Sequence, residues 1–145
     1  MIYRLCTICG KKIPQGQKCK CEVEAQKRKY KRYAAYRQDT KEQKLYSSKQ
    51  WITLRDLLKT RYLGLDIYEL IVNNRRVQGD TLHHIVEVKE DWSKRFNITN
   101  LIYVSNSTHR LIHIEYSKGE EQKKRMQEIL FKCVEEYYKR YVSIK

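Results

Sequence analysis

The chain has 145 residues, which suits one domain of ordinary size with a small appendage. Hydrophobic residues make up 41% of it, enough for a modest core, and no window approaches the length that a membrane-spanning helix needs. Lys and Arg number 31 against 17 Asp and Glu, which gives a formal net charge of +14. An excess of this size indicates a polyanionic partner, most commonly nucleic acid. An anionic membrane surface is the alternative, but the basic residues alternate with Tyr and do not face an apolar Leu/Phe stripe.

The N-terminal sequence MIYRLCTICG lacks the apolar stretch of a signal peptide, so we expect a cytoplasmic protein. In that compartment the five cysteines are expected to be metal ligands or core thiols and not disulfides.

Residues 1–22 carry two closely spaced cysteine pairs, C-T-I-C-G and C-K-C. A segment this short has no core of its own and gains order from a metal ion. We therefore predict an arm that holds one structural zinc with four thiolates, against the alternative of four unrelated thiols. The predicted zinc ligands are Cys6, Cys9, Cys19 and Cys21.

Residues 23–47 are predicted to form a basic linker helix, because strong helix formers fill the segment without Gly or Pro. Tyrosines recur every three residues among its basic side chains. We expect the helix to lie along a phosphate backbone; a solvated connector is the alternative. The predicted DNA-binding residues are Lys27, Arg28, Lys29, Lys31, Arg32 and Arg37.

From residue 48 the pattern becomes globular. Apolar residues from Trp51 to Tyr62 recur at helical spacing, with Ser47 or Ser48 as the cap. A β-rich run at 67–72 and a turn at Asn73 precede a second β-rich run, TLHHIVEV.

The rest of the chain is predicted as a long loop at 89–99, a short strand at 101–105 and a helix at about 106–118. Residues 120–142 have the pattern of an amphipathic helix, with Cys133 on its apolar stripe. We therefore expect Cys133 to be a core residue.

All four histidines fall into two tight pairs, His83-His84 and His109-x-x-x-His113, with Asn100 between the pairs. Adjacent residues on a strand point to opposite sides, whereas residues four apart on a helix share a face. Two helix histidines and one strand histidine can therefore supply three imidazole ligands to a divalent ion.

The remaining strand histidine can then take a proton from an attacking water. From the strand pattern alone, either His83 or His84 could be this base. The alternatives are that the histidines are purely structural, or that three of them hold a structural zinc.

Three segments resemble the HNH endonuclease family, the ββα-metal or His-Me finger nucleases: LHHIVEV at 82–88, TNLI at 99–102 and HRLIH at 109–113. The closest likeness is to small phage or prophage proteins that begin with a zinc-binding arm. The catalytic match covers about residues 48–118. The resemblance implies an α+β fold with a ββα-metal core, flanking helices and an N-terminal zinc knuckle arm. The nuclease domain would then span 48–145.

The resemblance also implies the role of each site residue. His84 would be the general base, and Asn100 would hold the loop of the finger. His83, His109 and His113 would bind the catalytic metal, one divalent ion of Mg, Mn, Ni or Zn. The chain departs from many family members because Ser105 and Thr108 stand where a second cysteine pair would brace the finger. We therefore expect packing, through Trp92 and Phe96, to hold the loop.

The expected function is metal-dependent hydrolysis of double-stranded DNA. The resemblance adds a possible role in phage genome packaging with terminase, or a homing-type role, in the host cytoplasm. The alternative from another class is a non-catalytic zinc-ribbon DNA-binding protein. A ribonuclease is a further alternative.

Overall fold

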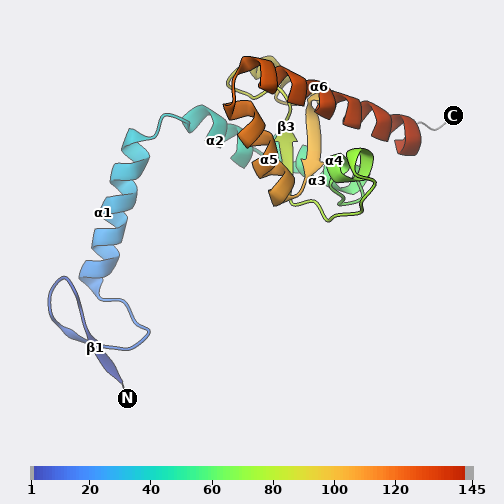
Figure 1. The fold of residues 1–145 in the computed structure, drawn as a ribbon. Coiled ribbons are helices and arrows are strands. Elements are labelled where there is room, and N and C mark those ends of the chain that lie inside the picture. The colour runs from blue at the N-terminus through green and yellow to red at the C-terminus, as the bar shows by residue number, and fades with distance from the viewer. Residues whose placement is uncertain (1, 143–145) are drawn as a thin grey trace. The chain divides into compact units, whose positions relative to one another are not determined.

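The computed structural model describes residues 2–142. Met1 of the predicted zinc arm and residues 143–145 of the predicted nuclease domain lie outside the described residues. The chain divides into two compact units, residues 1–41 and 42–145, and each is described by itself (Figure 1).

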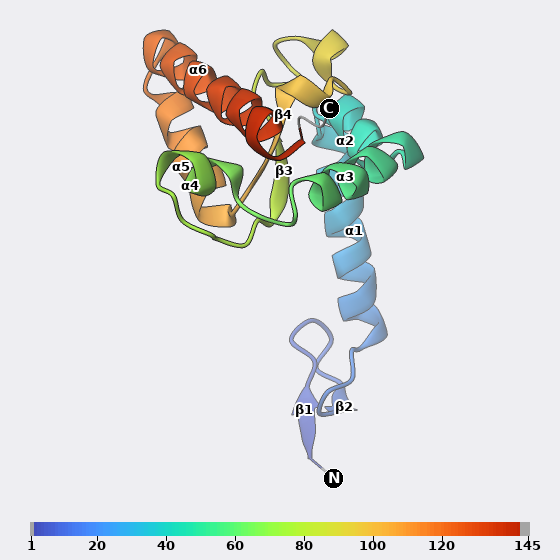
Figure 2. The ribbon, with the colours of Figure 1, turned by 90° about the vertical axis from the view of Figure 1, so that its right-hand side faces the viewer.

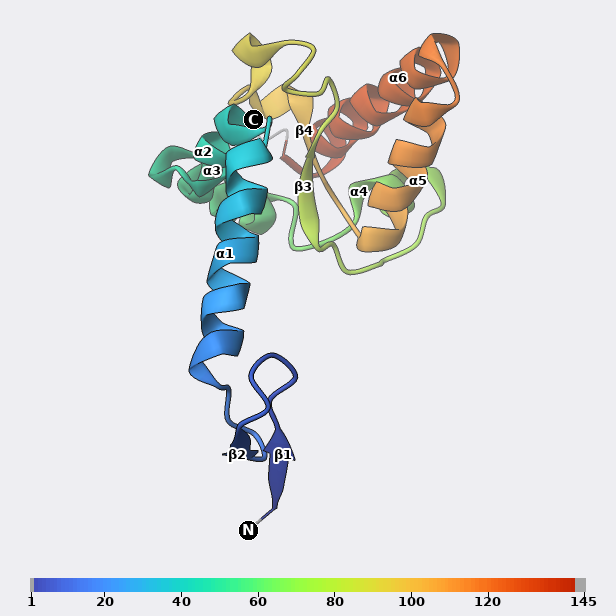
Figure 3. The same ribbon diagram turned by 90° about the vertical axis from the view of Figure 1, so that its left-hand side faces the viewer.

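The first unit is a small hairpin followed by a long helix (Figure 3). Strands β1 (Tyr3–Leu5) and β2 (Lys12–Pro14) pair antiparallel, and helix α1 spans Lys20–Tyr36. The hairpin is tied to the start of α1 because the Arg4 guanidinium binds both carboxylate oxygens of Glu22, each at 2.7 Å. Glu22 also accepts a hydrogen bond from the backbone N–H of Cys19, 2.9 Å away, and so caps the helix.

The predicted linker helix at 23–47 is two helices in the structure. Helix α1 ends at Tyr36, and α2 (Thr40–Ser47) begins after a short extended connection. The backbone of Arg37 is extended, and its guanidinium pairs with the carboxylate of Asp39 at 2.7 Å. This local ion pair forms across the break, and a continuous helix would point the two side chains, two positions apart, away from each other.

The second unit contains helices on a two-stranded sheet (Figure 2). Strands β3 (Thr81–His84) and β4 (Leu101–Val104) pair antiparallel, so that His84 lies opposite Leu101. Helix α5 (Asn106–Ser117) follows β4 directly and gives the ββα order. The remaining helices are α3 (Lys49–Arg61), α4 (Ile67–Val72) and α6 (Glu120–Tyr137). The predicted α+β fold class is confirmed.

The core of this unit gathers side chains from both strands and from helices α2 to α6. The Tyr62 hydroxyl donates to the Leu101 carbonyl at 2.8 Å, and the Tyr137 hydroxyl donates to the Arg61 carbonyl at the same distance. These bonds let two large aromatic side chains be buried without unpaired polar atoms. Cys133 is 2% exposed, which confirms its predicted place in the core.

The β-rich reading of residues 67–72 is wrong, because the segment is helix α4. The Asp66 carboxylate caps it by accepting from the backbone N–H of Glu69 at 2.9 Å. The other oxygen of Asp66 accepts from the Ser105 N–H at 2.8 Å, so the cap also fixes the start of α5. Short apolar runs do not distinguish a strand from a helix, and here the cap decides.

Two other elements, the strand in the TLHHIVEV run and the C-terminal helix, are shorter than predicted. The TLHHIVEV run is a strand only as far as His84. The predicted loop at 89–99 contains two 3₁₀ turns, η1 (Trp92–Lys94) and η2 (Ile98–Asn100), capped by Asp91 and Asn97. The C-terminal helix α6 ends at Tyr137 and continues as a wider turn, η3 (Tyr138–Val142).

Within residues 2–142, no helix combines the length and the apolar character that crossing a membrane requires.

Candidate active site

Three of the four histidines meet on one side of the ββα unit. His83 projects from β3 toward α5, which carries His109 and His113 one turn apart. Their ligand nitrogens all lie within 4.8 Å of one another. The ring centroid of His83 is 5.2 Å from that of His109 and 5.3 Å from that of His113. The Nε2 atoms of His109 and His113 are 3.2 Å apart.

The electrostatics of this cluster fit a bound cation. His83 is 4% exposed, and its Nε2 is buried without a hydrogen-bond partner among the described residues. Burial lowers the pKa of His83 to about 3, and the neighbouring His109 and His113 contribute to that shift. The ring is therefore neutral near pH 7 and presents a lone pair. An unpaired buried nitrogen is costly in an apolar site but is what a metal ligand requires.

His84, the next residue on β3, has different surroundings. Its Nε2 lies 2.9 Å from the backbone carbonyl of Arg95. A carbonyl can only accept, so Nε2 must carry the hydrogen and Nδ1 holds the lone pair of the neutral ring. Burial lowers the pKa of His84, and the bond to the Arg95 carbonyl opposes that shift.

Aromatic side chains surround the His84 ring. The indole of Trp51 on α3 stacks on it, with centroids 4.9 Å apart and planes 18° from parallel. The ring of Tyr46 on α2 lies 6.0 Å away. Neither aromatic side chain was predicted to be near the site from the sequence. Trp51 was expected only as an apolar position in its helix, and no sequence pattern identified the Arg95 carbonyl.

Asn100 holds the segment that follows the histidine doublet. Its side-chain oxygen accepts from the Val86 N–H at 2.8 Å, and its amide nitrogen donates to the Val86 carbonyl at 3.0 Å. The Ile85 carbonyl accepts from the Tyr116 hydroxyl at 2.7 Å and from the Gln127 amide at 3.1 Å. Side chains of Asn100, of α5 and of α6 therefore hold the chain after β3 by hydrogen bonds. The sequence pattern predicts only the contribution of Asn100.

Capping fixes the start of α5 relative to the sheet. The Ser105 hydroxyl accepts from the Thr108 N–H at 3.2 Å, and the Asp80 carboxylate accepts from the Asn106 N–H at 2.9 Å. Ser105 and Thr108 are both buried and are also bonded to each other through their hydroxyls at 3.2 Å. A hydrogen-bonded cap at these two positions therefore fixes the turn from β4 into α5.

The expected packing of the 89–99 loop also has a structural counterpart. Trp92 and Phe96 are partly buried against the core. The guanidinium of Arg95 lies near both rings, 5.2 Å from the Trp92 ring centroid and 5.0 Å from that of Phe96. These contacts hold the side chain of Arg95, whose backbone carbonyl meets His84.

The four arm cysteines form a second cluster, in the first unit. Their sulfur atoms lie within 4.8 Å of one another, with Cys6 and Cys21 3.3 Å apart and Cys9 and Cys19 3.7 Å apart. A tetrahedral zinc site with bonds of about 2.3 Å has sulfur atoms roughly 3.8 Å apart. Backbone N–H groups, that of Cys9 foremost, lower the pKa of Cys6 to about 7. The donor set and spacing fit zinc.

The predicted DNA-binding residues do not all have the same environment. Lys27, Arg28, Lys29, Lys31 and Arg32 lie on α1, a helix that buries none of its side chains. Arg37 lies beyond the end of that helix and is paired with Asp39. The three tyrosines of the segment, Tyr30, Tyr33 and Tyr36, are between 60% and 79% exposed.

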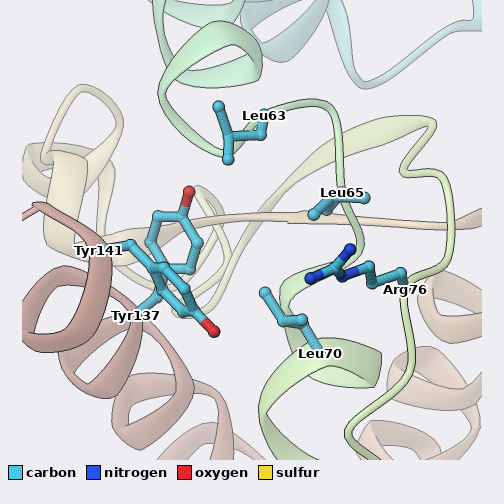
Figure 4. A pocket seen from close by; sticks show the side chains of 6 residues that line it. All are labelled: Leu63, Leu65, Leu70, Arg76, Tyr137 and Tyr141. Carbon is cyan, nitrogen blue, oxygen red and sulfur yellow. The ribbon is translucent and has the colours of Figure 1, made fainter.

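A separate hollow of about 410 Å³ lies between the end of α3, helix α4 and the C-terminal part of α6 (Figure 4). In Figure 4 two tyrosine rings face three leucines across it, with one guanidinium beside them. It contains none of the four histidines. Its lining is Leu63, Leu65, Leu70, Arg76, Tyr137 and Tyr141.

No protein-family model matches the chain, and no curated protein matches it significantly. One solved structure to which the chain is similar is the HNH endonuclease of the deep-sea thermophilic bacteriophage GVE2, crystallised with manganese ion. The identity is 21%, the match covers 70% of this chain and 97% of that one, and the TM-score is 0.48.

Proposed function

We propose that the protein is a metal-dependent endonuclease of the HNH type that hydrolyses phosphodiester bonds of double-stranded DNA. The observation that carries the proposal is the convergence of His83, His109 and His113, with the Nε2 atom of His83 buried and unpaired. A structural role for these histidines would leave that nitrogen unsatisfied.

In this proposal the three converging histidines hold one divalent ion. A cation held there supplies Lewis-acid stabilisation of the charge that develops on the phosphate. His109 and His113 provide a rigid pair on α5, and His83 approaches from β3. Imidazole ligands suit Zn²⁺, Ni²⁺ or Mn²⁺, whereas Mg²⁺ prefers oxygen.

His84 acts as the general base. Its Nε2–H is committed to the Arg95 carbonyl, so Nδ1 is the nitrogen that accepts a proton from water. As that N–H bond forms, the water oxygen attacks phosphorus and the bond from phosphorus to the 3′ oxygen breaks. The leaving 3′ oxygen takes a proton from solvent water and becomes a hydroxyl. The burial of His84 supports this role, because a lowered pKa keeps the base unprotonated at neutral pH.

Asn100 supports the chemistry without taking part in it. Its two hydrogen bonds to Val86 hold the backbone immediately after the histidine doublet. Catalysis requires the base and the metal to lie within a fraction of an ångström of their productive positions, and such hydrogen bonds help to hold them there.

The first unit supplies DNA affinity in this proposal. The four cysteines hold one structural zinc, and the basic side chains of α1 contact phosphates. Solvent exposure alone accounts for the polarity of α1, but not for its excess of Lys and Arg, and a polyanionic partner accounts for that excess. A phage-type setting, with genome packaging beside terminase or a homing-type role, rests on the resemblance of the sequence motifs alone.

Nicking of supercoiled plasmid tests the proposal against a non-catalytic zinc-ribbon DNA-binding protein. Purified protein should convert the plasmid to nicked or linear forms with Mn²⁺, Ni²⁺ or Mg²⁺, and EDTA should stop the reaction. Binding of the same plasmid without any cleavage, in every one of these ions, would favour the non-catalytic alternative.

A further inference from the structure

We propose that Trp51 and Tyr46, at the junction of α2 and α3, are positioning residues for the His84 imidazole. The inference rests on the proposed function, because it concerns how the general base of that site is oriented. Neither residue belongs to the ββα unit; both come from helices that precede it.

The hydrogen bond to the Arg95 carbonyl does not by itself orient the ring. It fixes Nε2 at 2.9 Å from that oxygen but leaves the ring free to swing about this contact. A second contact, to the face of the ring, is needed to fix the plane. The Trp51 indole supplies it, 4.9 Å away and nearly parallel. The two contacts together determine where Nδ1 points.

Trp51 is itself held in place. It is 4% exposed, and its backbone N–H donates to the Ser48 hydroxyl at 3.2 Å. The same hydroxyl donates to the Leu45 carbonyl at 2.6 Å and so joins α2 to α3. Tyr46, on α2, packs its ring edge-on against the indole, with centroids 5.3 Å apart and planes at 73°. The junction between the helices therefore fixes the indole from both the backbone and the ring side.

A purely structural role would make Trp51 one more filler of the core, and the test has to separate the two roles. Four variants are compared with wild type: Trp51→Ala, Trp51→Phe, Tyr46→Ala and Leu58→Ala. Leu58 is fully buried on the same helix and is matched to Trp51 as a core truncation. Tyr46 is 44% exposed, so its truncation spares the core if Trp51→Ala fails to fold.

The first readout is the tautomer of His84 in the metal-free protein, from two-bond proton–nitrogen NMR correlations. Wild type and Leu58→Ala should show a single form protonated at Nε2. Trp51→Ala should show a mixture, Tyr46→Ala a smaller admixture, and Trp51→Phe should restore the single form. This readout needs neither DNA nor metal.

The second readout is single-turnover cleavage with bound DNA. Trp51→Ala should reduce the rate by on the order of tenfold to a hundredfold, the cost of a base displaced by about 1 Å. DNA affinity and metal affinity should be unchanged, and Trp51→Phe should recover most of the rate. Tyr46→Ala should fall between Trp51→Ala and wild type.

The outcomes are distinguishable. A single Nε2-protonated form in folded Trp51→Ala or, if that does not fold, in Tyr46→Ala would overturn the positioning role. So would a rate loss in Leu58→Ala equal to that of the aromatic variants. Absence of cleavage by wild type in any divalent ion would overturn the proposed function, and the positioning role with it.

Discussion

Two adjacent histidines on one strand have different surroundings because the side chains of a strand alternate. His83 turns toward α5 and its neighbouring imidazoles, whereas His84 turns toward Trp51 and the Arg95 carbonyl. Among the described residues, the Nε2 atom of His83 has no hydrogen-bond partner and suits a cation. His84 uses Nε2 for the bond to the Arg95 carbonyl, which leaves Nδ1 to accept a proton. The proposed division between a metal ligand and a general base rests on these local contacts.

Removing one ligand at a time should weaken metal binding before it abolishes chemistry. We expect His109→Ala and His113→Ala each to lower metal affinity by roughly tenfold to a hundredfold, since two imidazoles remain. Excess metal should partly restore cleavage in both variants. Isothermal titration calorimetry with Mn²⁺ measures the affinities.

Ile114→Ala is the matched control for these variants, because Ile114 lies on the same helix and is 52% exposed. It should bind metal as wild type does. Unchanged metal affinity in both histidine variants would contradict the assignment of α5 as the metal platform.

Among the elements, hydrogen bonds from several sides hold the connection from β3 to β4, and the side chain of Asn100 makes two of them. Asn100→Ala leaves the N–H and carbonyl of Val86 without these partners. We expect a decrease of about 2 kcal/mol in the free energy of unfolding, together with slower cleavage. Urea unfolding followed by circular dichroism measures the first quantity.

Asn106→Ala provides the comparison, since Asn106 is exposed at the start of α5. It should change stability by less than about 0.5 kcal/mol. Equal stability of the two asparagine variants would show that the Asn100 bonds do not hold the loop.

The sequence allowed prediction of the elements whose ends carry clear signals. Polar residues before the helical patterns predict caps for α3 and α5, and the structure shows that Ser48 and Ser105 supply them. The short apolar run at 67–72 favours a strand by its pattern, whereas the Asp66 cap makes it helix α4. The sequence does not indicate the break between α1 and α2, because neither Gly nor Pro marks it.

Only the part of the candidate site that depends on the spacing of residues along the chain could be predicted from the sequence. The spacing of the histidines indicated which two share a helix face, and alternation indicated that His83 and His84 diverge. It did not indicate what His84 meets. The contact with the Arg95 carbonyl cannot be predicted from sequence, because every residue has a backbone carbonyl. The contact with Trp51 depends on how helix α3 packs against the sheet.

At the scale of the whole molecule, the division into two units predicts that binding and cleavage can be separated. A deletion of residues 1–38 removes the four cysteines and the basic residues of α1 but keeps α2, whose Leu45 belongs to the core. The shortened protein should bind DNA more weakly. The slope of log K against log salt should flatten by about 0.9 for each phosphate that the protein no longer neutralises.

At low salt and high protein concentration, the shortened protein should still nick plasmid. Fluorescence anisotropy over a salt series measures the slope, and circular dichroism verifies the fold. An unchanged slope would contradict the role of α1 in binding phosphates. Loss of all nicking in a folded protein would contradict the placement of the chemistry in the second unit.

The central claim is that His84 removes a proton from water at a metal site formed by the other three histidines. Single-turnover cleavage of a labelled duplex by His84→Ala, at saturating Mn²⁺ and saturating protein, tests it most directly. The rate should fall by on the order of a hundredfold or more, because the base acts in the chemical step. Calorimetric Mn²⁺ affinity, DNA affinity and the circular dichroism spectrum should match wild type. Cleavage by His84→Ala at a rate near that of wild type would contradict the account.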